Sequence, residues 1–177
     1  EPERIPQFLT SYLTPLSGLM TYYAEDLTIC ESLLRLFCDY TEQFVAVLNH
    51  DQSLTLFNAS AELLKNYSAH HCKSGQRVIK KSTVEAEAEE EQAYSDILCA
   101  IQLLTNLGAK DFIDACTSDT QQPGAQSNQV TDVIFFGLQQ ILPLMTQGLL
   151  QFPTLCAQFF DLVGFMTDTY PENPCFS

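Results

Sequence analysis

Apolar side chains recur at steps of three and four along most of this 177-residue chain. Residues 24–48 show the pattern clearly, because a regular series of positions there lines one face of a helix. The series is Leu27, Cys30, Leu34, Phe37, Thr41, Phe44 and Leu48. The alternating pattern typical of strands is nearly absent, and the chain holds only 7 Gly and 8 Pro. The sequence therefore predicts an all-α fold.

Six helices are expected, over residues 5–22, 24–48, 53–71, 84–107, 130–145 and 153–170. Ser53 is expected to cap the third helix, and Pro153 suits the first turn of the last one, where an N–H would have no partner. Pairing the helices in order gives three hairpins, over residues 5–48, 53–107 and 130–170. Polar segments at 73–83 and 117–128 are expected to be loops, and the second has too little apolar surface to be well ordered.

A weak internal repeat relates the first hairpin to the last. Leu27, Leu34 and Phe37 have the same spacing as Leu155, Leu162 and Phe165. Several helices are apolar around much of their circumference, as expected where neighbours stack on both sides. These features predict an α-solenoid of stacked antiparallel hairpins, an ARM-like superhelix of the HEAT type. Because the chain begins and ends abruptly, residues 1–177 are expected to be one segment of a longer solenoid.

The charge of the chain excludes several classes of function. With 22 acidic and 8 basic side chains the net charge is −14. A nucleic-acid-binding module or a polybasic membrane-binding surface would need a basic face, so neither partner is expected. Neither a signal peptide nor a transmembrane span is predicted. The 7 cysteines are an odd number without a CxxC pair, which favours a reducing compartment such as the cytosol or nucleus.

The sequence carries no pattern typical of catalysis or of cofactor binding. His70, His71 and Cys72 could be metal ligands, but no second Cys/His pair accompanies them, so a metal site is not expected. Glycine-rich phosphate-binding motifs are absent, and no nucleophile has the surroundings of an activated one. The chain is therefore predicted not to be an enzyme and to need no cofactor.

The acidic run at residues 85–91, followed by Asp96, is the sharpest polar feature. It has two interpretations. Acidic residues stabilise the first turn of a helix and keep a protein soluble, so the run can be ordinary solvated surface. It can also be a surface that attracts a basic partner through complementary charge.

Three strings carry a more specific resemblance: AEEEQAYSDIL at 88–98, LLTNLGAKDFID at 103–114 and LPLMTQGLLQFPTLC at 142–156. They resemble exportins, which are nuclear transport receptors of the importin-β superfamily, and looser similarity extends over most of the chain. The resemblance implies a RanGTP-dependent export receptor built from HEAT repeats that shuttles between nucleus and cytoplasm. The implied partners are Ran in its GTP form, nucleoporins, and protein cargo such as Smad factors and the hypusinated translation factor five-A.

The resemblance also implies where cargo would bind. In these receptors the second helix of each hairpin generally lines the concave surface, which corresponds here to residues 24–48, 84–107 and 153–170. An acidic wall on those helices would attract basic cargo, and salt would weaken the contact. The candidate cargo-facing residues are Glu89, Glu90, Glu91, Asp96, Asp161 and Asp168.

Two alternatives remain open on the sequence alone. A HEAT scaffold of another class, such as a nucleoporin or a phosphatase scaffold, would share the architecture but not the cargo. A small lipid-binding helical bundle would need a cavity, which Phe135, Phe136, Phe159 and Phe160 could line. Aromatic residues at helical spacing are usually core, which argues against the bundle.

Overall fold

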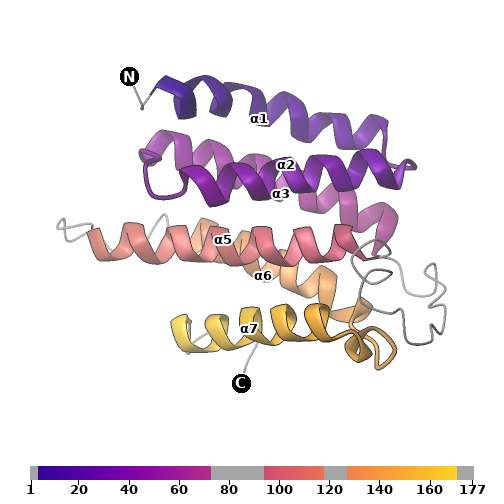
Figure 1. Ribbon diagram of the computed structural model, residues 1–177. Coiled ribbons are helices and arrows are strands. Elements are labelled where there is room, and N and C mark those ends of the chain that lie inside the picture. Colours follow the sequence, from indigo (N-terminus) through magenta and orange to yellow (C-terminus); the bar gives the residue numbers. More distant parts are fainter. Residues whose placement is uncertain (1–3, 73–93, 118–126, 171–177) are drawn as a thin grey trace.

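The computed structural model describes residues 4–72, 94–117 and 127–170. Within these ranges the chain forms six α-helices that pack as antiparallel pairs, and no strand (Figure 1). The helices are α1 (Arg4–Tyr22), α2 (Leu27–Phe44), α3 (His50–His71), α5 (Ser95–Thr117), α6 (Ser127–Ile141) and α7 (Pro153–Thr169). Two short 3-10 helices, η1 (Leu142–Leu144) and η2 (Leu149–Gln151), connect α6 to α7. The predicted all-α class is confirmed.

The helix ends differ from the prediction where local capping or proline chemistry decides them. Ser53 does not cap α3, because Asn49 stands earlier and forms a capping box with Gln52. The Asn49 carboxamide accepts the Gln52 backbone N–H at 3.0 Å, and the Gln52 carboxamide accepts that of Asn49 at 2.9 Å. Asp26 caps α2, so that helix begins at Leu27. Pro143 lies in η1, where the chain leaves the α-helical path of α6.

The second and third predicted helical pairs have other bounds as well. The helix that was expected to end at residue 107 continues as α5 to Thr117. The structure does not describe residues 73–93 or 118–126. The expected helix start at 84, the expected loop at 73–83 and most of the expected loop at 117–128 therefore lie outside the described residues. Residue 117 belongs to α5, and residues 127 and 128 belong to α6. The flanking helices α5 and α6 therefore each extend into the predicted loop segment.

Among the described helices, the two most extensive contacts join helices that alternate along the chain. α1 packs on α3, α2 packs on α5, and α5 also packs on α6 and α7. α3 in turn contacts α6, whereas α1 and α2, which are neighbours in sequence, contact each other less. The helices follow one another from α1 at the top of Figure 1 to α7 at the bottom. One hydrophobic core runs through them all.

Two glycines let α5 approach its neighbours closely. A Cβ atom on Gly137 of α6 would lie 2.6 Å from Leu104 Cδ2 on α5, and a Cβ on Gly108 of α5 would lie 2.5 Å from Phe165 Cε1 on α7. Such separations are below van der Waals contact, so only glycine fits at these positions without a shift of the neighbour. Gly164 of α7 has nothing within 4 Å of the equivalent atom.

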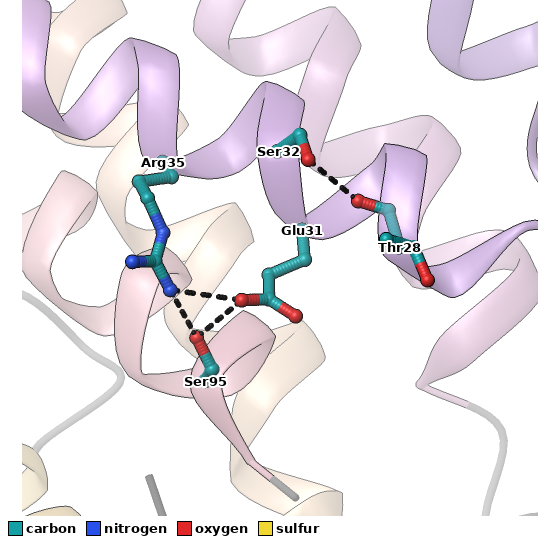
Figure 2. Close-up of polar contacts among 5 residues, drawn as sticks. All are labelled: Thr28, Glu31, Ser32, Arg35 and Ser95. Carbon is teal, nitrogen blue, oxygen red and sulfur yellow. Dashed lines mark hydrogen bonds and ion pairs between the residues drawn. The ribbon is translucent and has the colours of Figure 1, made fainter. Parts of the chain in front are cut away.

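A polar cluster fastens the start of α5 to the middle of α2 (Figure 2). The Arg35 guanidinium donates to Glu31 Oε1 at 2.8 Å and to Ser95 Oγ at 2.7 Å. Ser95 Oγ donates to the same Glu31 oxygen at 2.6 Å. The three groups satisfy one another at a partly solvated edge, where we expect an ion pair to fix the register of the helices more than to add stability.

Burial raises the pKa of the Cys38 thiol from 9.0 to about 12, with further increases from Cys99, Asp39 and Glu42. The unfolded chain loses this proton near pH 9.0, whereas the folded chain keeps it to higher pH. The contribution of Cys38 to the free energy of unfolding is therefore constant below that pH and decreases as the pH rises toward about 12.

Urea unfolding on both sides of pH 9.0 tests this expectation. We expect the stability difference between the native chain and Cys38→Ala to shrink as the pH rises above that value. The difference between the two chains isolates Cys38, since burial raises the pKa of Cys30 and Cys99 as well. A difference that stays constant with pH would contradict the account.

Candidate functional site: an apolar groove with an acidic wall

An open apolar groove of about 540 Å³ lies between α1 and α2. Its lining residues come from the middle of α1 and the C-terminal half of α2. They are Phe8, Leu9, Tyr12, Leu13, Leu16, Leu36, Asp39, Tyr40, Gln43 and Phe44. On both helices these positions are spaced by three to four residues or are adjacent, so each helix presents one continuous ridge to the groove.

The groove is apolar because α1 has two apolar faces. One face is buried in the core and carries Leu13 and Met20, which are 2% and 0% exposed, and Leu13 also borders the groove. The other carries Ile5, Phe8 and Tyr12, which are 58%, 62% and 49% exposed. Large contiguous apolar surface of this kind is uncommon on a folded protein unless it serves an interaction.

Polar contacts hold the two helices together at the groove. Tyr40, which is buried, shares a hydrogen bond of 2.6 Å between its hydroxyl and that of Thr10. The Thr10 hydroxyl donates to the Pro6 carbonyl at 2.6 Å, so the Tyr40 hydroxyl is the donor to Thr10, and it also lies 3.4 Å from that carbonyl. These buried hydrogen bonds join α1 to α2, so they fix the relative position of the two helices that carry the exposed aromatic side chains.

The one charged residue in the groove lining, Asp39, belongs to α2. Asp39 and Gln43 line it and are exposed, and Glu42 lies beside them in sequence and is exposed too. Aromatic rings stand along both helices: the Phe8 and Tyr12 centroids are 5.0 Å apart, and those of Tyr40 and Phe44 are 5.2 Å apart. The groove therefore combines aromatic contact area with negative charge on one side.

The His and Cys side chains that were considered as metal ligands do not line the groove. Within the described ranges, no group of three or more His, Cys, Asp or Glu side chains could hold a metal ion. His71 Nε2 is instead 2.6 Å from the Ala24 carbonyl, and the Cys72 side chain is buried. No helix in the described part of the chain is both long and apolar enough to cross a membrane.

The structure describes three of the six predicted acidic residues. Glu89, Glu90 and Glu91 lie outside the described residues. Asp161 and Asp168 are both exposed on α7, seven residues apart and hence on one face of that helix.

Asp96 needs a correction, because it is only 2% exposed and points into the protein. Its Oδ2 accepts a hydrogen bond of 2.6 Å from the hydroxyl of Tyr67, which lies on α3. The carboxylate therefore serves as an internal acceptor between α3 and α5, and the interpretation of Asp96 as a cargo-facing residue is wrong for this conformation.

The four phenylalanines of the lipid-binding alternative do not line the groove. Phe159 is buried in the core, Phe160 is 57% exposed, and Phe135 and Phe136 are half-buried. The residues that do line the groove were not predicted as a site. The signal for the groove in the sequence is the second apolar stripe of α1, at Ile5, Phe8 and Tyr12. No protein-family model matches the chain.

Proposed function

We propose that this chain is a segment of a nuclear export receptor of the importin-β superfamily, resembling exportin-4. In this proposal it forms part of an α-solenoid that carries protein cargo through nuclear pores together with RanGTP and shuttles between nucleus and cytoplasm. The chain itself supplies binding surface and no catalytic group.

The observation that best supports the proposal is the packing of alternate helices. α1 on α3, continued by α3 on α6, forms one row, and α2 on α5, continued by α5 on α7, forms another. Two rows of stacked helices are what a HEAT-type solenoid requires, because each hairpin buries its faces against the next. The net charge of −14 agrees with a preference for basic cargo.

Within the described residues, Asp161 and Asp168 are the remaining candidates for contact with cargo. They lie on α7, the second helix of the last pair, which the resemblance places on the concave side. Exposed carboxylates of this kind act mainly on the association rate, and their effect is screened over about 8 Å at physiological ionic strength.

Charge reversal in the full-length receptor tests this role. We expect Asp161→Lys combined with Asp168→Lys to slow association with translation factor five-A severalfold at low salt and much less at high salt. The control is Asp51→Lys combined with Asp132→Lys, which changes the net charge equally at exposed positions on α3 and α6, the first helices of their pairs. If both double variants slow association equally, only the net charge matters. If neither variant changes the association rate, α7 is not part of the cargo surface.

A further inference from the structure

We propose that the groove between α1 and α2 is the stacking face for a further helical hairpin of the same polypeptide, which precedes α1 and covers α1 and α2 as these two cover α3 and α5. The inference deepens the proposed function, because it rests on the solenoid architecture proposed above, although it needs neither Ran nor cargo. It is supported by a correspondence between the exposed faces of α1 and α2 and the covered faces of α3 and α5.

The buried residues of α1 have counterparts on α3. Both helices carry a buried series with the same steps of three and four residues. The series on α1 is Thr10, Leu13, Ser17 and Met20, and that on α3 is Phe57, Ser60, Leu64 and Tyr67. Because equal spacing places side chains on equivalent faces of a helix, the two series align α1 with α3 residue by residue.

In this alignment the α1 side of the groove corresponds to a covered face of α3. The groove residues Leu9, Tyr12 and Leu16 correspond to Leu56, Ala59 and Leu63. Leu9 and Tyr12 are 36% and 49% exposed, whereas Leu56 and Ala59 are 0% and 2% exposed. The face that is buried on α3 is therefore still exposed on α1.

α1 is the helix that covers this face of α3. Ser17 Oγ donates to Glu62 Oε2 at 3.2 Å, and Asn66 Nδ2 donates to Thr21 Oγ1 at 3.0 Å. On both helices the second contact lies one turn further along than the first, so α1 and α3 run in the same direction. Ala59 lies on the side of α3 that carries Glu62 and Asn66, because positions three and seven residues apart share a helix face.

The same correspondence relates α2 to α5. The buried series on α2 is Leu33, Leu34, Phe37, Cys38, Tyr40 and Thr41, and that on α5 is Asp96, Ile97, Ala100, Ile101, Leu103 and Leu104. In the resulting alignment, a stripe of α2 that runs along the groove corresponds to a stripe of α5. The stripe on α2 is Ser32, Leu36, Asp39 and Gln43, and that on α5 is Ser95, Cys99, Gln102 and Asn106. The four residues on α2 are exposed, whereas Ser95 is buried and the other three residues on α5 are half-buried.

α2 is the helix that covers this stripe of α5. Arg35 donates to Ser95 Oγ at 2.7 Å, and Asn106 Nδ2 lies 4.0 Å from Cys38 Sγ. Both sides of the groove therefore match faces on which a preceding hairpin already lies within this chain. A solenoid continues through such faces, because each repeat buries its surface against its neighbours.

The charge of Asp39 is compatible with a stacked hairpin. The covered stripe of α5 is polar too, and Gln102 Nε2 donates there to Asn106 Oδ1 at 3.0 Å. Gln102 is only half-buried, so a carboxylate at the matching position of α2 keeps contact with water. A second copy of this chain is the poorer occupant, since two copies that each carry a net charge of −14 repel each other.

Hydroxyl-radical footprinting compares the exposure of Tyr12 in the 177-residue chain with that in the full-length receptor. We expect Tyr12 to be oxidised severalfold more slowly in the receptor, because the hairpin covers Tyr12 as α1 covers Ala59. Tyr22 is the matched control on the same helix. It is 84% exposed and its counterpart on α3, Ala69, is exposed too, so Tyr22 should be oxidised equally fast in both proteins.

A truncation and a substitution locate the cover. A receptor that lacks everything before residue 1 of this chain should oxidise Tyr12 as fast as the 177-residue chain does. Tyr12→Asp would place an unpaired carboxylate in the stacked face, so it should raise the oxidation of Leu9 in the full-length receptor to the rate in the 177-residue chain. Tyr22→Asp should leave the oxidation of Leu9 unchanged. Circular dichroism of both variants shows that the helices are retained.

Three outcomes would overturn the proposal. Tyr12 is oxidised equally fast in the full-length receptor and in the 177-residue chain. Protection of Tyr12 survives the truncation, which places the cover elsewhere in the receptor. Tyr12 becomes protected in the 177-residue chain as its concentration rises, which identifies a second copy as the occupant. These measurements contain no Ran, so protection of Tyr12 in a receptor that binds cargo without RanGTP would support the stacking and contradict the export proposal alone.

Discussion

Gly137→Ala is expected to destabilise the protein, although alanine is the better helix former. The added methyl group would meet Leu104 Cδ2 at 2.6 Å. Overpacking of this kind costs about 1–3 kcal/mol and the gain in helix propensity is about 0.5–1 kcal/mol, so over most of this range the net change is a loss. Leu104→Ala removes a side chain that is 0% exposed and should cost about 2–5 kcal/mol on its own.

The double variant makes the argument specific. In Leu104→Ala combined with Gly137→Ala, the new methyl group enters the space that leucine has left, so the loss in the free energy of unfolding should be smaller than the sum of the two single losses. Gly164→Ala is the matched control, because nothing lies within 4 Å of its added methyl group, and it should stabilise the protein slightly. Urea unfolding measures all four variants, and strict additivity would contradict the close contact between α5 and α6.

Tyr67→Phe is expected to cost about 1.5–3 kcal/mol in the free energy of unfolding, because it removes a hydrogen bond to a charged group. Tyr67 is 1% exposed and donates to the buried Asp96 carboxylate at 2.6 Å. Short bonds to a carboxylate are stronger than neutral ones, and the buried acceptor cannot readily turn to water instead.

Tyr22→Phe provides the comparison for this loss. Tyr22 ends α1 and is 84% exposed, so the same chemical change there should alter the stability by less than about 0.5 kcal/mol. Thermal and urea unfolding of both variants measure the difference. If Tyr67→Phe unfolds at the same urea concentration as Tyr22→Phe, the contact between α3 and α5 does not stabilise the fold as we describe.

Helical periodicity predicted the fold class because it reports directly which face of each helix is buried. Leu155 and Leu162 are 0% exposed on α7, as their spacing indicated, and α7 begins at Pro153 as expected. Helix ends depend on local capping, which the pattern does not contain. Asn49 competes with Ser53 as a cap, and the side chain of Gln52 decides in favour of Asn49.

The environment of single polar residues could not be predicted in the same way. Asp96 follows an acidic run, so its sequence context predicts an exposed side chain. It becomes an internal hydrogen-bond acceptor because the fold brings Tyr67, 29 residues away in the sequence, next to it. The groove posed a related difficulty. The sequence shows that α1 is apolar on two faces, but only the fold shows that Leu13 and Met20 are buried in the core and that Phe8 is left exposed.

The most direct test of the export proposal is RanGTP-dependent cargo binding by the full-length receptor. Immobilised translation factor five-A, in its hypusinated form, is incubated with the receptor and with Ran loaded with either GTP or GDP. The proposal predicts that the immobilised cargo retains the receptor and Ran together when Ran carries GTP. When Ran carries GDP, neither should be retained. Equal retention with both forms, or none with either, would contradict it.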